Sequence, residues 1–188
     1  AQCTPCAYIC KIDYIYIKLY NTMLSITIGP MFSGKTTSLV NHYKNNKNNK
    51  LVIDYDIDND NIYLETHDNI KIPCVKVKKL LNIEVSILVD TVYINEAQFF
   101  EDLYLFVKQM LFNKKDIYIY GLDGDYKQEK IGNIIDLIPI CDNIIKLNGN
   151  CYNCKNLSIF SKRIINNKEQ YLPDEKYYLP VCRKCLII

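Results

Sequence analysis

A glycine-bounded loop near the start of the chain has the residue types and spacing to bind phosphate. Eight consecutive residues match the pattern G-x-x-x-x-G-K-[ST]: Gly29, Pro30, Met31, Phe32, Ser33, Gly34, Lys35 and Thr36. In such a loop the backbone N–H groups turn inward around an anion. A lysine at this position reaches the outer phosphates of a nucleotide, and the threonine hydroxyl can bind magnesium.

The sequence on either side of this loop supports the phosphate-binding interpretation. An apolar run at residues 23–28 is typical of a strand, and residues 37–43 can form a helix. A helix that begins at the loop adds its positive N-terminal end to the anion site. We therefore expect a strand, a phosphate loop and a helix in succession. The pattern alone leaves open a chance turn with a glycine C-cap.

Glu96 is the second candidate for chemistry. An apolar run at residues 92–94 ends at Asn95-Glu96. In open α/β sheets ligands bind at the carboxyl ends of the strands, so we expect Glu96 to lie beside the phosphate loop. A carboxylate there can accept the proton of an attacking hydroxyl. The segment alone leaves open a solvated glutamate with no catalytic role.

Two C-x-x-C pairs near the C-terminus form the third candidate site: Cys151, Cys154, Cys182 and Cys185. Four thiolates can surround Zn²⁺ tetrahedrally and leave no open position, so such a zinc would be structural. Disulfides and free thiols are the alternatives, but nine cysteines without an export signal favour reduced thiols. Cys3, Cys6 and Cys10 are a weaker metal candidate because no fourth ligand lies nearby in the sequence.

The elements that must position these residues alternate along the chain. Further strands are expected at residues 51–53, 87–94, 117–120 and 144–147. Apolar residues at helical spacing predict a helix over residues 99–112. Strands separated by helices in this order predict an α/β fold with a parallel sheet and crossover helices.

We divide the chain into three parts. Residues 1–22 precede the first methionine, Met23, and we interpret them as a non-native or disordered upstream extension. Residues 23–148 are expected to form the α/β domain that carries the phosphate loop. After Asn148, cysteine pairs, polar turns and tyrosines replace the periodic core pattern. We therefore expect residues 149–188 to form a small zinc-ribbon-like domain.

Composition narrows the possible partners and location. The chain has 188 residues, 49% of them hydrophobic, and a formal net charge of +2 with no large basic face, so nucleic acid is not an implied partner. No apolar run reaches the roughly 20 residues that span a bilayer, so we expect no membrane partner. Lys11, Asp13 and Lys18 interrupt any signal-peptide pattern, and we expect a cytoplasmic protein.

Taken together, these motifs resemble the type II thymidine kinases, the cytosolic cellular and poxvirus enzymes. The resemblance covers residues 23–185 and is closest in layout to the poxvirus members. It rests on the phosphate loop, Glu96 with Gln98-Phe99-Phe100, Leu122-Asp123-Gly124 and both cysteine pairs. It implies a P-loop NTPase sheet with flanking helices, plus a small zinc-binding C-terminal domain that carries a lasso loop.

The resemblance also implies an activity. Family members transfer the γ-phosphate of ATP to the 5′-hydroxyl of thymidine with the help of magnesium, a step of nucleotide salvage for DNA synthesis. They assemble as homotetramers, so the resemblance implies an oligomer with thymidine and ATP as its small-molecule partners.

Roles follow from the resemblance residue by residue. Glu96 corresponds to the catalytic base. The eight loop residues, together with Asn95 and Gln98, correspond to the ATP and phosphate site, and Thr36 and Asp58 to the magnesium site. The residues that correspond to the nucleoside site are Met31, Leu122, Tyr126, Ser161 and the lasso tyrosine, Tyr178.

Several positions depart from the family pattern. Asn95 stands where the family has aspartate, Asp60 where it has arginine, and Pro173-Asp174 where it has Gly-Gly. A neutral amide is a weaker partner for a hard cation than a carboxylate. These departures motivate an alternative, a catalytically weak nucleotide-binding relic of the family.

The sequence allows one further hypothesis about function, and His67 carries a separate expectation. A P-loop ATPase or a zinc-ribbon nucleic-acid binder is a third hypothesis, disfavoured by the near-neutral charge. For His67 we expect a local hydrogen bond within its loop rather than a part in catalysis.

Overall fold

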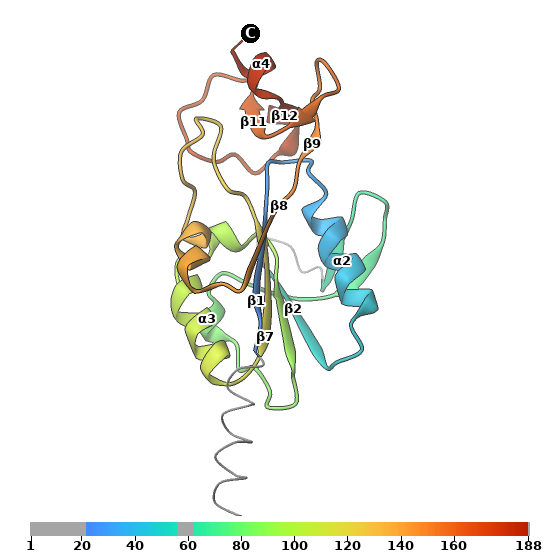
Figure 1. The fold of residues 1–188 in the computed structure, drawn as a ribbon, viewed down its shortest axis with the longest axis vertical. Coiled ribbons are helices and arrows are strands. Elements are labelled where there is room, and N and C mark those ends of the chain that lie inside the picture. Colours follow the sequence, from blue (N-terminus) through green and yellow to red (C-terminus); the bar gives the residue numbers. More distant parts are fainter. Residues whose placement is uncertain (1–21, 56–61, 188) are drawn as a thin grey trace, which may run out of the picture.

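A computed structural model of the chain places a parallel sheet below a smaller C-terminal region (Figure 1). The structure describes residues 22–55 and 62–187. Asp58 and Asp60 lie outside the described residues, as do residues 1–21 of the expected upstream extension. Within the described ranges, no helix is long and apolar enough to cross a membrane.

The sheet has six strands in the order β5-β2-β6-β7-β1-β8. All neighbouring pairs are parallel. The strands are β1 (Leu24–Ile28), β2 (Lys50–Tyr55), β5 (Val75–Val77), β6 (Thr91–Ile94), β7 (Asp116–Gly121) and β8 (Asn143–Lys146). This sheet confirms the predicted α/β fold class, and parallel order brings the carboxyl ends of the strands to one edge.

The sheet has two apolar faces, because successive side chains along each strand point to opposite sides. One face packs against α3 (Leu103–Phe112) and uses residues such as Ile53, Ile94 and Ile119. The other face packs against α2 (Lys35–Asn45) and uses Val52 and Tyr93. The two helices accordingly lie on opposite sides of the sheet (Figure 1). Burial on both faces explains why the central strands are almost continuously apolar.

Two predicted elements had the wrong boundaries. The strand expected over residues 87–94 begins only at Thr91, and Ile87 and Leu88 are exposed. The helix expected over residues 99–112 is a short 3₁₀ turn, η2 (Ala97–Phe99), followed by α3. Phe100, between these two elements, has extended backbone angles (φ −87°, ψ 110°), so the apolar periodicity continues although the helix does not.

A short hairpin and an edge strand were not predicted from the sequence. The hairpin consists of β3 (Tyr63–Glu65) and β4 (Lys71–Pro73), and β5 follows and pairs with β2 at the edge of the sheet. Each of these strands has three residues, too few to display a readable alternation. Two 3₁₀ helices, η1 (Leu80–Asn82) and η3 (Ile134–Ile140), complete the connections along the sheet.

The C-terminal region sits above the carboxyl edge of the sheet (Figure 1). Its elements are β9 (Gly149–Asn150), β10 (Leu157–Ser158), β11 (Phe160–Arg163), η4 (Glu175–Tyr177), β12 (Tyr178–Val181) and α4 (Arg183–Leu186). The backbone N–H of Met31 donates to Ser161 Oγ at 2.9 Å, which ties the phosphate loop to β11. A side chain at Gly149 would meet the carbonyl oxygen of Phe32 at 2.8 Å, so glycine permits this close approach.

Candidate active site and metal centre

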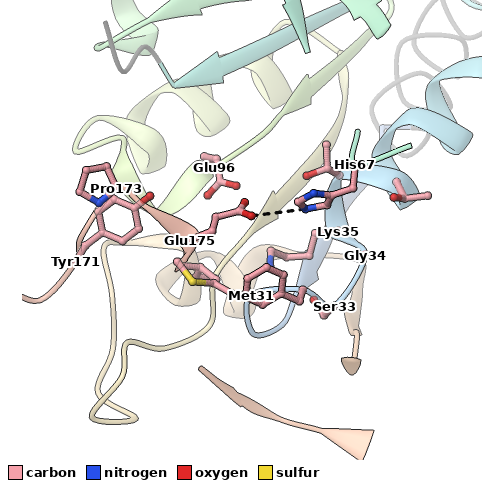
Figure 2. A pocket seen from close by; sticks show the side chains of 13 residues that line it. Met31, Ser33, Gly34, Lys35, His67, Glu96, Tyr171, Pro173 and Glu175 are labelled. Carbon is pink, nitrogen blue, oxygen red and sulfur yellow. Dashed lines mark ion pairs between the residues drawn. The ribbon is translucent and has the colours of Figure 1, made fainter. Parts of the chain in front are cut away.

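The phosphate loop connects β1 to α2 and forms one wall of a cavity of about 580 Å³. Two of its residues have the positive φ angles that the curved loop needs, 62° at Phe32 and 80° at Gly34. Figure 2 shows the side chains around this cavity. The lining residues are Met31, Phe32, Ser33, Gly34, Lys35, Thr36, Thr37, His67, Glu96, Leu122, Tyr171, Pro173 and Glu175.

Lys35 is the buried cation of this cavity. Its Nζ donates to the carbonyl oxygens of Gly29 at 3.2 Å and Pro30 at 2.8 Å. Burial lowers the pKa of Lys35, and the nearby carboxylates of Glu96, Asp123 and Glu175 act in the opposite direction. The ammonium group is therefore held at the loop among negative charges, where a phosphate could replace its carbonyl partners.

Glu96 lies at the carboxyl end of β6, as the sequence predicted, and its side chain reaches the same cavity. Burial raises the pKa of Glu96, whereas the charge of Lys35 and a hydrogen bond from Gln98 lower it. Its backbone has a φ of 49°, an uncommon left-handed conformation for a residue with a side chain. Strained residues of this kind concentrate at functional sites.

Gln98 joins Glu96 to the neighbouring strand. Its amide Nε2 donates to Glu96 Oε2 at 2.6 Å, and its Oε1 accepts the backbone N–H of Leu122 at 2.9 Å. A side chain on Gly121 would meet Gln98 Oε1 at 2.4 Å, so the amide fills the space that this glycine leaves. Gln98 thus orients the glutamate, but it is not among the residues that line the cavity.

Asn95, which was expected at the phosphate site, does not line the cavity, and its assignment stays a prediction. Its side chain is buried away from the cavity lining, and its Nδ2 donates to Asp54 Oδ1 at 2.9 Å. Thr36, by contrast, lines the cavity at the start of α2. The other expected magnesium residue, Asp58, lies outside the described residues.

The residues expected to bind a nucleoside fall into two groups. Met31 and Leu122 line the main cavity. Ser161 lies behind the phosphate loop and, with Pro30, lines a smaller cavity of about 160 Å³. Tyr126 and Tyr178 line neither cavity, and both contact Arg163. Their assignment to the nucleoside remains a prediction.

Arg163 organises the long connection between β11 and β12. Its guanidinium lies 3.8 Å from the ring centroid of Tyr126, and its Nη2 donates to the Tyr178 hydroxyl at 2.5 Å. The same guanidinium donates to backbone carbonyls of this connection, at residues Asn167, Glu169 and Gln170. The Tyr178 hydroxyl also accepts the backbone N–H of Leu172 at 2.8 Å. One buried arginine therefore sets the course of the loop.

Two residues of the cavity wall, Tyr171 and Glu175, were missed by sequence analysis, and Pro173 was noted only as a departure from the family pattern. Tyr171, Pro173 and Glu175 come from this same connection, and Tyr171 and Pro173 lie across the cavity from Lys35 (Figure 2). Glu175 Oε2 lies 3.8 Å from His67 Nε2, so an ion pair bridges the two sides of the cavity when His67 is protonated. His67 therefore faces the cavity and contacts a distant segment, whereas we expected a contact within its own loop.

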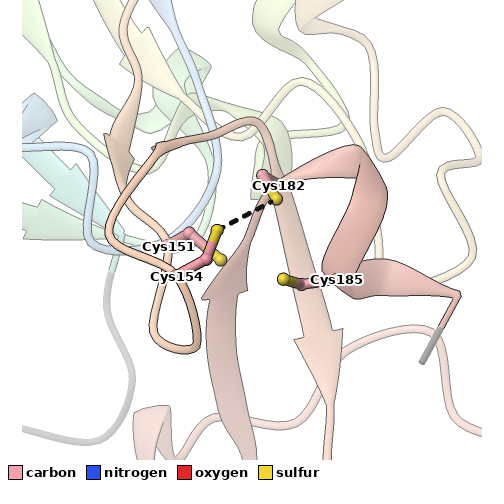
Figure 3. Close-up of side chains that lie close together, drawn as sticks. All are labelled: Cys151, Cys154, Cys182 and Cys185. Atoms are coloured by element: carbon pink, nitrogen blue, oxygen red, sulfur yellow. Dashed lines mark hydrogen bonds between the residues drawn. The ribbon is translucent and has the colours of Figure 1, made fainter.

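The four cysteines of the two C-x-x-C pairs converge (Figure 3). Their sulfur atoms all lie within 4.8 Å of one another, and those of Cys154 and Cys182 are 3.5 Å apart. Zinc–sulfur bonds of about 2.3 Å in a tetrahedron place sulfurs roughly 3.8 Å apart, so the cluster fits a zinc ion. Cys151 and Cys185 are buried, which supports a structural rather than a catalytic metal.

A parallel sheet with a phosphate loop at its carboxyl edge defines a P-loop nucleotide-binding protein. Comparison with known proteins identifies the family. A family model described as "Thymidine kinase" matches residues 22–186. The chain therefore belongs to the thymidine kinase family.

Individual relatives agree with this assignment. The chain is 35% identical over 175 residues to a thymidine kinase of Myxoma virus (strain Uriarra), which covers 89% of this chain and 97% of the relative. It is 34% identical over 184 residues to a thymidine kinase of Sheeppox virus (strain KS-1), covering 94% and 99%. A thymidine kinase of Oryza sativa subsp. japonica is 34% identical over 181 residues, covering 88% of this chain and 66% of the relative.

Proposed function

We propose that this protein is a thymidine kinase that transfers the γ-phosphate of ATP to the 5′-hydroxyl of thymidine, giving thymidine monophosphate. The observation that carries the proposal is the pairing of Lys35 and Glu96 in one cavity beneath the phosphate loop. This reaction requires two groups from the protein: a cation that binds the phosphates and a base that accepts the proton of the attacking hydroxyl.

The proposed division of labour follows from the positions of these groups. Backbone N–H groups of the loop and Lys35 would hold the phosphate donor. Glu96, kept in place by Gln98, would accept the proton of the 5′-hydroxyl as the new bond to phosphorus forms. A carboxylate whose pKa is raised by burial is a better proton acceptor than an ordinary glutamate, provided that it is ionised.

The loop fits a phosphate in one further respect. The Ser33 hydroxyl is buried and has no hydrogen-bond partner within the described residues. A buried hydroxyl without a partner is costly, and a phosphate oxygen would satisfy it. Thr36 is the described residue that would hold magnesium, and this ion would supply charge neutralisation between the phosphates. The four clustered cysteines would hold a structural zinc.

The test is a Glu96→Gln variant assayed with MgATP and labelled thymidine. Glutamine keeps the size of the side chain but cannot accept a proton, so we expect turnover to fall by about 100-fold or more. Binding of MgATP, measured by calorimetry, should change by less than about threefold. Near-normal turnover of the variant would refute the role of Glu96.

A substrate panel separates the proposed activity from the alternatives. Thymidine should be phosphorylated in preference to the other deoxynucleosides. ATP binding without any turnover would instead support the weak relic that Asn95 suggested, but the comparisons favour a thymidine kinase over that relic. A homotetrameric assembly and a cytoplasmic location are further parts of the proposal, which sedimentation analysis and cell fractionation would test.

A further inference from the structure

A buried carboxylate outside the proposed reaction lies at the end of β2. Asp54 is only 8% exposed and does not line the cavity. The end of its strand lies beside the end of β6, because the backbone N–H of Asn95 donates to the carbonyl oxygen of Ile53 at 2.8 Å. Asp54 thus neighbours the residue that directly precedes Glu96.

When the carboxylate of Asp54 is ionised, the hydrogen bond between Asp54 and Asn95 has only one possible donor, the Asn95 amide. An ionised carboxylate can only accept, so the nitrogen of the Asn95 amide must face it, with Nδ2 at 2.9 Å from Oδ1. The oxygen of the same planar amide then points away from Asp54. Asp54 also accepts the backbone N–H of Tyr55 at 3.1 Å, which limits the rotation of the carboxylate.

The second carboxylate oxygen of Asp54 faces a lysine. Lys76 Nζ lies 4.0 Å from Asp54 Oδ2, and the two side chains are 17% and 11% exposed. One partly buried cation therefore balances one buried carboxylate, and the neutral amide of Asn95 adds no charge. An aspartate at position 95 would put two carboxylates at the separation of a hydrogen bond, with one lysine for both.

This arrangement bears on Glu96. Its backbone has a strained left-handed conformation, which persists only where the surroundings hold it. On one side Gln98 holds the carboxylate, and on the other Asn95 is fixed by its two bonds to the end of β2. Asn95 is thus held by hydrogen bonds directly before Glu96, the residue with the strained backbone.

We propose that Asp54 is a positioning residue of the active site. Its carboxylate at the end of β2 accepts the amide of Asn95 and fixes this residue, so that Glu96 is presented to the cavity. The Asp54–Asn95 pair acts as one unit, in which a carboxylate belongs at position 54 and an amide at position 95 or the reverse, but not two carboxylates. This inference rests on the proposed function.

The pair is tested by exchanging its members. The variants are Asp54→Asn, Asn95→Asp and the double variant that carries both, with Glu84→Gln as a control that removes an exposed carboxylate elsewhere. Each is examined by thermal unfolding without nucleotide and by steady-state kinetics with thymidine and MgATP.

Asn95→Asp should be the most damaging variant although it matches the family pattern. We expect its unfolding midpoint to fall by about 5 °C or more and kcat to fall about tenfold or more. The KM for thymidine should change by less than about threefold, since Glu96 is displaced rather than the nucleoside site. The double variant should recover to within about threefold of the wild-type kcat, and Glu84→Gln should match the wild type.

Three results would overturn the proposal, two of them directly. One is an Asn95→Asp variant as active as the wild type, and the other is a double variant no better than the worse single variant. Recovery of the midpoint without recovery of kcat would reduce Asp54 to a structural role and equally reject positioning. A wild type without thymidine phosphorylation would refute the proposed function itself, whereas the unfolding data would still show whether the pair is coupled.

Discussion

The two sides of the cavity are stabilised by different interactions. The side formed by the sheet rests on two apolar clusters, one on each face, with strands whose central residues are fully buried. The side formed by the C-terminal region has a small apolar cluster composed of Val181 and three of the four clustered cysteines. Its long connection follows the hydrogen bonds of Arg163.

This difference separates two functions within one site. Lys35 and Glu96, which would perform the chemistry, belong to the well-packed side. Tyr171, Pro173 and Glu175, which cover the cavity, belong to the side that contains the four clustered cysteines and Arg163. Loss of the covering side should therefore remove function while the sheet stays folded.

The largest effect should come from removal of the metal cluster. In a Cys182→Ser variant we expect zinc to be lost and thymidine phosphorylation to fall about 100-fold or more, because structural zinc contributes ~10 kcal/mol or more to local folding. Far-UV circular dichroism should keep most of the helical signal from α2 and α3. Zinc content is measured by atomic emission.

Cys141→Ser is the matched control, since Cys141 is a partly buried cysteine outside the cluster. It should retain both zinc and activity. Full activity of the zinc-free Cys182→Ser protein would contradict the dependence of the covering side on the metal.

A smaller effect is expected from Arg163→Lys. Lysine keeps the charge but cannot serve the hydroxyl of Tyr178 and several carbonyls together, so we expect a loss of ~3 kcal/mol in local stability. The KM for thymidine should rise about tenfold or more, and the KM for MgATP should change little. Hydrogen exchange of residues 164–177 would report the loosened connection directly.

Arg183→Lys controls for the substitution itself, because Arg183 is exposed and its guanidinium lies 5.0 Å from the Phe160 ring centroid. It should behave like the wild type. If Arg163→Lys raised both KM values equally, the two sides of the cavity would not be separable in the way we describe.

The smallest effect should come from Glu175→Gln. Burial is the main cause of the raised pKa of Glu96, and the charges of Asp54 and then Glu175 act in the same direction. Protonation of Glu96 removes the base, so kcat/KM should fall as the pH drops through this pKa, at a higher pH than for an ordinary glutamate. Glu175→Gln should move this acid limb to lower pH and lower the KM for MgATP about two- to fivefold.

Glu169→Gln removes an exposed carboxylate from the same connection and should leave the pH profile unchanged. Two outcomes would show that the covering side does not influence Glu96. In one, kcat/KM of the wild type falls at the pH expected for an unburied glutamate. In the other, Glu175→Gln leaves the acid limb of the pH profile where it is in the wild type.

The local motifs were predictable because each depends on neighbours in the sequence. The phosphate loop, Glu96 at a strand end and the paired cysteines were located from spacing alone, and the parallel sheet from alternating apolar segments. The hairpin of β3 and β4 was missed because three-residue strands carry no periodic signal.

What the sequence by itself determined is the set of chemical groups: a phosphate loop, a carboxylate after a strand and four thiols in two pairs. Only the tertiary structure decided which distant groups meet, such as Glu175 with His67, Arg163 with Tyr126 and Asp54 with Asn95. The reason is physical. Loop and capping geometry depend on consecutive backbone angles, whereas the charge around a buried side chain depends on segments that only folding brings together.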